Sequence, residues 1–356
     1  MIKPIIIETP RGKRKIGPGQ PVFIVAEMSC NHLQSYKRAL KIIDAAAAAG
    51  VDAVKLQTYT PDTHTIDSDK EYFQVKVNKA WAGQTLYQLY QKTYTPWKWQ
   101  PKLKKFAESK GMLLFSAPSD IASVNFLKKI NIELYKVTSF ELVDTFLLRK
   151  IAQTKKPVIV SRGMASIEEI KLAIKILREN GTPQIAVLHC VSSYPAKPEQ
   201  MNLSTIPDIA KKFKVVSGLS DHTLGITVPI VSVALGACII EKHFTLSRGD
   251  GGQDSAFSIE PKEMKQLVKA VREAEKAIGK PHYSAEDKEA ENVIFRRSLF
   301  VIKDIKKGDE FTEKNIRSIR PGQGLAPKYL DVILGKKAIK NIERGTPLSW
   351  NLINRK

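Results

Sequence analysis

The sequence has few cysteines and no long uninterrupted hydrophobic run. Its 356 residues include only Cys30, Cys190 and Cys238, which are too few and too far apart for a disulfide framework or a zinc knuckle. The longest stretch without Asp, Glu, Lys or Arg, residues 222–240, contains a proline and two glycines, and it favours a loop, a short helix and a strand over a membrane span. The N-terminus lacks the pattern of a signal peptide, so we expect a cytoplasmic protein with no membrane partner.

Acidic residues are also scarce relative to basic ones. Lys and Arg number 57 against 36 Asp and Glu, which leaves a formal net charge of +21 and indicates an anionic partner. A nucleic-acid-binding protein would combine clustered basic residues with exposed aromatic ones. Acidic residues interrupt most basic runs here, and Trp81, Trp97 and Trp99 lie outside the basic N-terminal stretch. We therefore expect a phosphorylated or carboxylated small molecule as partner, and no nucleic acid.

Short apolar, β-rich runs alternate with helical stretches over the first 280 residues. Eight such runs occur, at 22–27, 53–58, 112–117, 133–139, 157–161, 185–190, 215–220 and 238–243. Alternation of this kind, at this length, predicts an α/β fold of the (β/α)₈ TIM-barrel type. A doubly wound open sheet is the alternative, but it would want a glycine-rich loop after its first strand. Met28-Ser-Cys-Asn-His32 follows that strand without a glycine.

The pattern changes after the barrel, so the sequence predicts three parts. Residues 1–282 form the catalytic barrel, 283–294 a polar linker and 295–356 a small domain. Within the last part, residues 304–316 and 341–353 repeat one spacing: an isoleucine, a glycine three residues later, a large apolar residue three beyond that and an isoleucine five further on. A pseudo-symmetric unit of this size has a marginal core of its own, and we expect it to dock on the barrel or on a partner chain.

Polar residues gather at the carboxyl ends of the predicted strands, where TIM barrels carry their active sites. His222 and His243 end consecutive strands, close enough to share a metal ion with open positions for substrate. Glu27 and Asp254 are candidates for further contacts with this metal ion. The alternative is that one histidine is a hydrogen-bonding core residue.

Two lysines, Lys55 and Lys136, lie within apolar strands, where an unpaired ammonium is costly to bury. Each is therefore paired with a carboxylate or meets an anionic ligand. Hydroxyl groups surround the same rim, which suits a substrate with both a phosphate and a carboxylate; they belong to Ser116, Ser139, Ser161 and Ser220. A Schiff-base lysine remains the alternative. Glu141 is placed to act as a general base or to accept a sugar hydroxyl.

One segment, residues 59–94, interrupts the strand–helix alternation and is too long for a simple loop. It is either a surface decoration or a lid over the site.

These motifs together resemble the sialic acid synthase family over nearly the whole chain. The tail from Arg297 through Arg320-Pro-Gly322 resembles the antifreeze-like (SAF, β-clip) domain of that family. The remaining stretches that carry the resemblance are Phe23–Glu27 with Asn31-His32, Ala53–Thr58, Tyr135–Ser139, Leu188–Pro195, Gly218–Gly225 and Ile240–Phe244.

The resemblance implies condensation of phosphoenolpyruvate with an open-chain N-acetylated amino sugar. His222 and His243 would bind a divalent metal, manganese first, with magnesium or cobalt as alternatives. Phosphoenolpyruvate would be surrounded by Lys55, Lys136, Ser139, Ser161, Ser192 and Ser220. The sugar and the reacting carbons would be faced by Glu27, Gln57, Glu141, Tyr194 and Asp254. Arg320 would reach the sugar from the other subunit of a domain-swapped homodimer.

Two departures from the family lie near the expected phosphoenolpyruvate. Ser116-Ala-Pro118 stands where many members have Ser-Thr-Pro, and Ser192 stands where neuraminate synthases often have Asn. The segments Trp81–Trp97 and Ser139–Asp144 resemble pseudaminic acid synthases, whose sugar is a 2,4-diacetamido-2,4,6-trideoxy-altrose. Its methyl group suits an apolar pocket wall. Neuraminate or legionaminate synthesis, from a mannose-type sugar, is the alternative.

Overall fold

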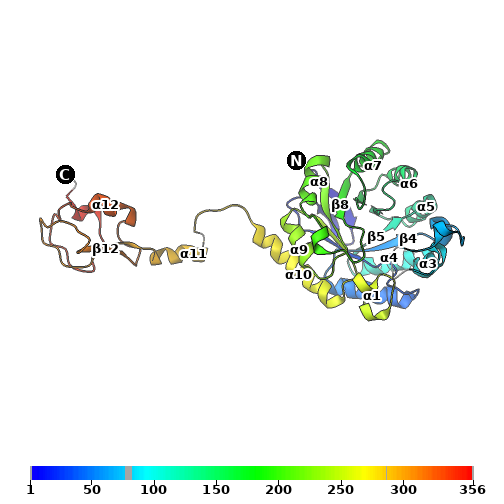
Figure 1. The fold of residues 1–356 in the computed structure, drawn as a ribbon, viewed down its shortest axis with the longest axis horizontal. Helices are drawn as coiled ribbons and strands as arrows, with labels where there is room; N and C mark the ends of the chain where they lie inside the picture. The colour runs from blue at the N-terminus through cyan, green and yellow to red at the C-terminus, as the bar shows by residue number, and fades with distance from the viewer. Residues whose placement is uncertain (1, 77–81, 286, 355–356) are drawn as a thin grey trace. The chain divides into compact units, whose positions relative to one another are not determined.

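A computed structural model describes residues 2–76, 82–285 and 287–354. The chain divides into two compact units, Met1–Gly279 and Lys280–Lys356. In the first unit eight parallel strands close into a barrel in the order β10-β3-β4-β5-β6-β7-β8-β9, and helices surround it (Figure 1). The predicted TIM barrel is therefore confirmed.

The eight strands match the eight predicted runs. They are β3 (Phe23–Glu27), β4 (Ala53–Thr58), β5 (Leu113–Pro118), β6 (Tyr135–Val137), β7 (Val158–Ser161), β8 (Ile185–Cys190), β9 (Val216–Asp221) and β10 (Ile239–His243). The helices that follow them in turn are α1 (Tyr36–Ala49), α4 (Gln100–Ser109), α5 (Ile121–Lys129), α6 (Thr145–Ala152), α7 (Ile167–Glu179), α8 (Thr205–Phe213), α9 (Thr227–Ala234) and α10 (Pro261–Ile278).

The helices begin and end where the local sequence favours it. Ser35 caps the first turn of α1, and Gly50 ends that helix in the left-handed conformation with φ of 85°, which glycine adopts without steric cost. Ser166 and Glu169 form a capping box at the start of α7. None of the helices in the described part of the chain is long and apolar enough to cross a membrane.

A hairpin that the sequence pattern did not reveal precedes the barrel. Strands β1 (Ile5–Thr9) and β2 (Gly12–Ile16) pair antiparallel, and Ile5, Ile7 and Ile16 join the main hydrophobic core. The hairpin also bonds residues that directly precede barrel strands: Gln184 accepts from the amide of Ile6, and Pro21 accepts from Arg14. It therefore covers the amino-terminal end of the barrel.

The segment between β4 and α4 contains the predicted interruption. It holds helices α2 (Pro61–His64) and α3 (Leu86–Thr93) and the short 3₁₀ turns η1 (Glu71–Phe73) and η2 (Trp97–Trp99). Trp81, which contributed to the resemblance, lies outside the described residues. Short 3₁₀ turns also extend two other connections. The turn η3 (Pro198–Gln200) follows β8, and the turns η4 (Arg248–Asp250) and η5 (Ser255–Phe257) follow β10.

The second unit is built on the repeat seen in the sequence. Strands β11 (Ser298–Val301) and β12 (Ile316–Ile319) pair antiparallel, and the equivalent residues Ile305 and Ile342 form an isolated bridge. All six apolar repeat positions are buried in one cluster: Ile305, Phe311, Ile316, Ile342, Leu348 and Ile353. The remaining elements are α11 (Asp287–Glu291), α12 (Leu330–Ile333), η6 (Asn292–Phe295), η7 (Pro327–Tyr329) and η8 (Trp350–Leu352).

We predict that Ile16→Ala lowers the free energy of unfolding of the first unit by about 2–5 kcal/mol, because it leaves a cavity in the core. Chemical denaturation followed by circular dichroism measures this. Ile6→Ala is the matched control on the opposite, exposed face of the hairpin, with an expected change within about 0.5 kcal/mol. Equal effects of the two substitutions would contradict the packing of the hairpin on the barrel.

Candidate active site

The strand register divides the strand-end polar residues into two groups. Successive residues of a strand point to opposite faces, while residues paired across neighbouring strands share a face. Glu27 pairs with Lys55 on one side and with His243 on the other, and Ser220 pairs with Glu241. These side chains form an inner layer at the carboxyl end of the barrel. His189, Asp221 and Lys242 occupy the alternate, outer positions.

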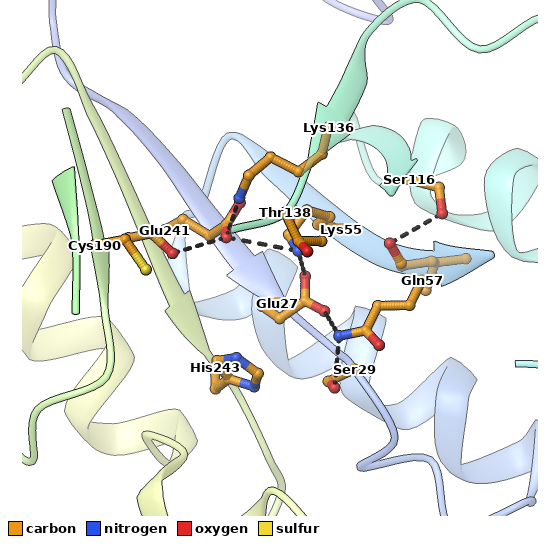
Figure 2. Close-up of polar contacts among 12 residues, drawn as sticks. Glu27, Ser29, Lys55, Gln57, Ser116, Lys136, Thr138, Cys190, Glu241 and His243 are labelled. Atoms are coloured by element: carbon orange, nitrogen blue, oxygen red, sulfur yellow. Dashed lines mark hydrogen bonds and ion pairs between the residues drawn. The ribbon is translucent and has the colours of Figure 1, made fainter. Parts of the chain in front are cut away.

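An ion-pair cluster of two lysines and two glutamates occupies this inner layer (Figure 2). Lys55 Nζ lies 2.6 Å from Glu27 Oε2 and 3.6 Å from Glu241 Oε1. Lys136 Nζ lies 2.6 Å from the same Glu241 oxygen. All four side chains are buried. The sequence required each lysine to have a carboxylate or an anionic ligand, and the structure supplies carboxylates to both.

Burial and mutual charge act in opposite directions on the pKa values of this cluster. Burial alone would raise the pKa of Glu241, but Lys136 and Lys55 outweigh it and lower that pKa to about 2. Burial lowers the pKa of Lys55, yet the two carboxylates more than compensate and raise it. For Glu27 and Lys136 burial prevails, so the pKa of Glu27 is raised and that of Lys136 is lowered. With Lys and Glu ionised, the cluster has no net charge.

Glu241 and Ser29 belong to the site although the sequence analysis did not select them. Glu241 stands two residues before His243 in a buried strand, so strand alternation alone places it on the same inner face. Ser29 follows β3, accepts a hydrogen bond from Gln57 at 3.1 Å and donates one to Asp254. No regular spacing marks Ser29, because it lies in a loop.

A chain of polar contacts joins the cluster to the histidines. Gln57 Nε2 donates to Glu27 Oε1 at 3.2 Å as well as to Ser29. Asp254, bonded to Ser29, has its Oδ2 3.6 Å from Nδ1 of His243. Burial raises the pKa of Asp254. Six of the predicted residues therefore lie in one connected region: Glu27, Lys55, Gln57, Lys136, Asp254 and His243.

The two histidines face each other at the rim. The ring centroids of His222 and His243 are 5.4 Å apart, and Tyr194 packs on His222 at 4.4 Å while Phe257 packs on His243 at 5.0 Å. The ring Nδ1 of His222 lies 2.7 Å from the carbonyl oxygen of Val191. A proton on that nitrogen, donated to the carbonyl, leaves Nε2 with a lone pair.

The donor set of this pair fits a divalent cation held in part by other ligands. Nδ1 of His243 is buried without a hydrogen-bond partner among the described residues, and burial lowers the pKa of this ring, which keeps it neutral as a ligand must be. The described residues contain no group of three or more His, Cys, Asp or Glu arranged to hold a metal ion. Water and substrate oxygens would therefore complete the coordination.

Hydroxyl groups surround the same end of the barrel. Ser161 is buried at the end of β7, and its Oγ has no hydrogen-bond partner among the described residues. Ser139 and Ser192 bond each other at 2.9 Å, and Ser220 donates to Glu241 at 3.1 Å. A Cβ on Gly163 would lie 2.1 Å from Cβ of Ser139, so this position requires glycine.

The hydroxyl of Ser116 lies elsewhere. Ser116 pairs in register with Leu56 and therefore points outward, where its hydroxyl donates to the Leu56 carbonyl at 2.9 Å and contacts Thr58 Oγ1 at 2.6 Å. Figure 2 shows it bonded away from the ion-pair cluster. As these contacts occupy the hydroxyl, we leave Ser116 out of the substrate-binding set that its sequence position had suggested.

Glu141 and the interrupting segment lie at another side of the rim. The hydroxyl of Thr138 donates to the Glu141 carboxylate, whose pKa is raised by burial. In the segment, His64 stacks on Tyr59 with centroids 4.7 Å apart and meets Tyr90 at 4.4 Å. The pKa of Tyr90 is raised by burial and by the charge of Glu141. The segment is thus packed beside the predicted site.

Arg320 belongs to the second unit, where it is exposed and precedes a cis peptide bond to Pro321. Its predicted contact with the sugar involves a different unit of the protein and stays a prediction.

Comparisons with known proteins identify both units. The model of the NeuB family matches residues 42–283, and that of the SAF domain matches residues 296–354, which confirms the predicted antifreeze-like unit. The chain is 46% identical to a pseudaminic acid synthase of Campylobacter jejuni over 92% of its own length and 95% of the relative's. It is 42% identical to a pseudaminic acid synthase of Helicobacter pylori, covering 94% and 99%.

A solved structure agrees with these relatives. The N-acetylneuraminic acid synthetase of Leptospira borgpetersenii, crystallised with citrate, is 35% identical and superposes with a TM-score of 0.70, covering 79% of this chain and 93% of that one. The family model spans more than half of the chain and includes seven of the eight barrel strands. The protein described here belongs to the NeuB family.

Proposed function

We propose that this chain is a pseudaminic acid synthase. The observation that carries the proposal is the ion-pair cluster at the same end of the barrel as the two facing histidines. The Ser161 hydroxyl, to which no described residue hydrogen-bonds, lies at that end too. The reaction joins C3 of phosphoenolpyruvate to the aldehyde carbon of an open-chain 2,4-diacetamido-2,4,6-trideoxy-altrose. One water is consumed, and a nine-carbon 2-keto acid and phosphate are formed. The two relatives named above support this choice of sugar.

The roles of the residues follow from their positions. Lys55, Lys136 and Ser161 hold phosphoenolpyruvate, because ammonium and hydroxyl donors suit its phosphate and carboxylate oxygens. Ser139, Ser192 and Ser220 add hydroxyls around it. Glu27 and Glu141, whose pKa values are raised, are the acid–base groups beside the reacting carbons. Gln57, Tyr194 and Asp254 face the sugar.

His222 and His243 would hold the divalent metal, manganese by preference, with magnesium or cobalt as alternatives. When bound, it would supply Lewis acidity to the aldehyde oxygen. The protein's own contribution is to keep both rings facing each other between Tyr194 and Phe257.

A small domain at 295–356, joined by a linker at 283–294, completes the proposed site. Arg320 contacts the N-acetyl group of the sugar from the partner subunit of a domain-swapped homodimer. A guanidinium can donate to an amide carbonyl with a fixed geometry, which supports recognition of the N-acetyl oxygen.

A Schiff-base lyase is the mechanistic alternative, since burial lowers the pKa of Lys136 and a neutral amine is required for that chemistry. The 2.6 Å contact with Glu241 opposes loss of the proton. Borohydride trapping with pyruvate distinguishes the two mechanisms: the proposed synthase forms no covalent adduct.

In the presence of manganese, we expect phosphoenolpyruvate to release phosphate with 2,4-diacetamido-2,4,6-trideoxy-altrose, and not with N-acetylmannosamine. A colorimetric phosphate assay with each sugar, and a control without sugar, measures this. A response to N-acetylmannosamine or to a legionaminate precursor alone would replace the proposed sugar by one of the alternatives.

Ser161→Ala should raise KM for phosphoenolpyruvate about tenfold, because a hydrogen bond to a charged ligand is lost. Its stability should not fall, since the hydroxyl has no hydrogen-bond partner within the part of the chain that the structure describes. Ser116→Ala is the matched control: it should cost about 1 kcal/mol of stability through its lost hydrogen bonds and leave this KM unchanged. The reverse outcome would assign Ser116, and not Ser161, to the substrate.

His222→Ala should abolish both activity and binding of manganese, measured by equilibrium dialysis, while circular dichroism stays unchanged. His32→Ala is the control, because His32 is equally buried but bonds Thr95; it should retain manganese binding whatever its effect on stability. Unchanged manganese binding by His222→Ala would remove this residue from the metal site.

A further inference from the structure

The two carboxylate oxygens of Glu241, in the ion-pair cluster, have very unequal contacts. Its Oε1 receives three groups: Lys136 Nζ at 2.6 Å, Lys55 Nζ at 3.6 Å and the hydroxyl of Ser220 at 3.1 Å. Its Oε2 is buried and has no hydrogen-bond partner among the described residues. Figure 2 shows the carboxylate between the two lysines.

The two lysines depend on this carboxylate to different extents. Lys55 also has Glu27 at 2.6 Å, whereas the ion pairs of the described residues give Lys136 no carboxylate but Glu241. Two buried ammonium groups without an anion between them would repel each other strongly in a medium of low dielectric constant. A lysine side chain also has several rotatable bonds, so an unpaired Lys136 would lose its fixed position.

We propose that Glu241 is a positioning residue for phosphoenolpyruvate binding. Its single bridging oxygen holds Lys55 and Lys136 side by side, charged and pointing into the barrel, before the substrate arrives. The substrate then meets two donors already in place, which reduces the ordering that binding must impose. The proposal rests on the proposed function in assigning these lysines to phosphoenolpyruvate. It goes beyond that function in giving Glu241 a role that involves no reacting atom.

The kinetic test is Glu241→Gln, which keeps the shape and removes the charge. We expect KM for phosphoenolpyruvate to rise about tenfold or more, because the lysine donors are no longer fixed, while KM for the sugar changes less than about threefold. Glu241→Asp restores the charge on a shorter side chain and should recover part of the loss.

Asp221→Asn is the matched control for the loss of a buried carboxylate. The Asp221 carboxylate lies 2.6 Å from Lys242 Nζ on the outer face of β9 and β10, the two strands that carry Ser220 and Glu241 on their inner face. Its substitution should lower thermal stability without the selective rise in KM for phosphoenolpyruvate. The same rise with Asp221→Asn would make the effect of Glu241→Gln a general consequence of a disturbed barrel, and would overturn the proposal.

A thermal-unfolding cycle tests the pairing without any activity. Glu241→Gln should lower the unfolding midpoint, because it leaves Lys136 as an uncompensated buried charge. The double variant Glu241→Gln with Lys136→Met removes both charges. Its unfolding midpoint should fall by less than the sum of the falls in the two single variants. Additive losses would contradict the bridge. If Glu241→Gln does not fold, Glu241→Asp and the double variant carry both tests.

The outcomes separate this inference from the proposed function. A folded Glu241→Gln enzyme with an unchanged or lower KM for phosphoenolpyruvate would overturn the positioning role alone. A wild-type enzyme that releases no phosphate with any of the sugars would instead overturn the proposed function.

Discussion

The arrangement of the active site depends on one constraint: two lysines are buried at the carboxyl end of a barrel, and each must find an anion. The barrel meets this constraint with Glu27 and Glu241, which come from strands adjacent to each other across the closure of the sheet. The resulting cluster is neutral when ionised. It can therefore persist in a buried site before any substrate binds, at a cost far below that of unpaired charges.

The same cluster orders its surroundings. Gln57 links Glu27 to Ser29, and Ser29 links that pair to Asp254 beside His243. A network whose members are hydrogen-bonded to one another is rigid, so Glu27, Gln57 and Asp254 hold fixed relative positions. The net charge of +21 does not arise from this cluster, since its two lysines are balanced by two carboxylates.

The sequence predicted the barrel well because each strand and helix has a local signal. It also selected most of the polar residues that the structure brings together at one end of the barrel, since polar side chains at strand ends are unusual in a buried sheet. It selected Ser116 and left out Glu241, although both lie at strand ends. The strand register shows that Ser116 points outward, whereas Glu241 shares the inner face of His243, two residues further along the same strand. Ser29 and the amino-terminal hairpin were missed because contacts distant in sequence define them. The position of Arg320 relative to the barrel is equally beyond a local pattern.

The most direct test of this account is a crystal structure with phosphoenolpyruvate and manganese bound. The account predicts phosphoenolpyruvate oxygens within hydrogen-bond distance of Nζ of Lys55 and Lys136 and of Oγ of Ser161, with Glu241 still bridging the two lysines. Phosphoenolpyruvate bound away from these lysines, or Glu241 turned away from both, would contradict it.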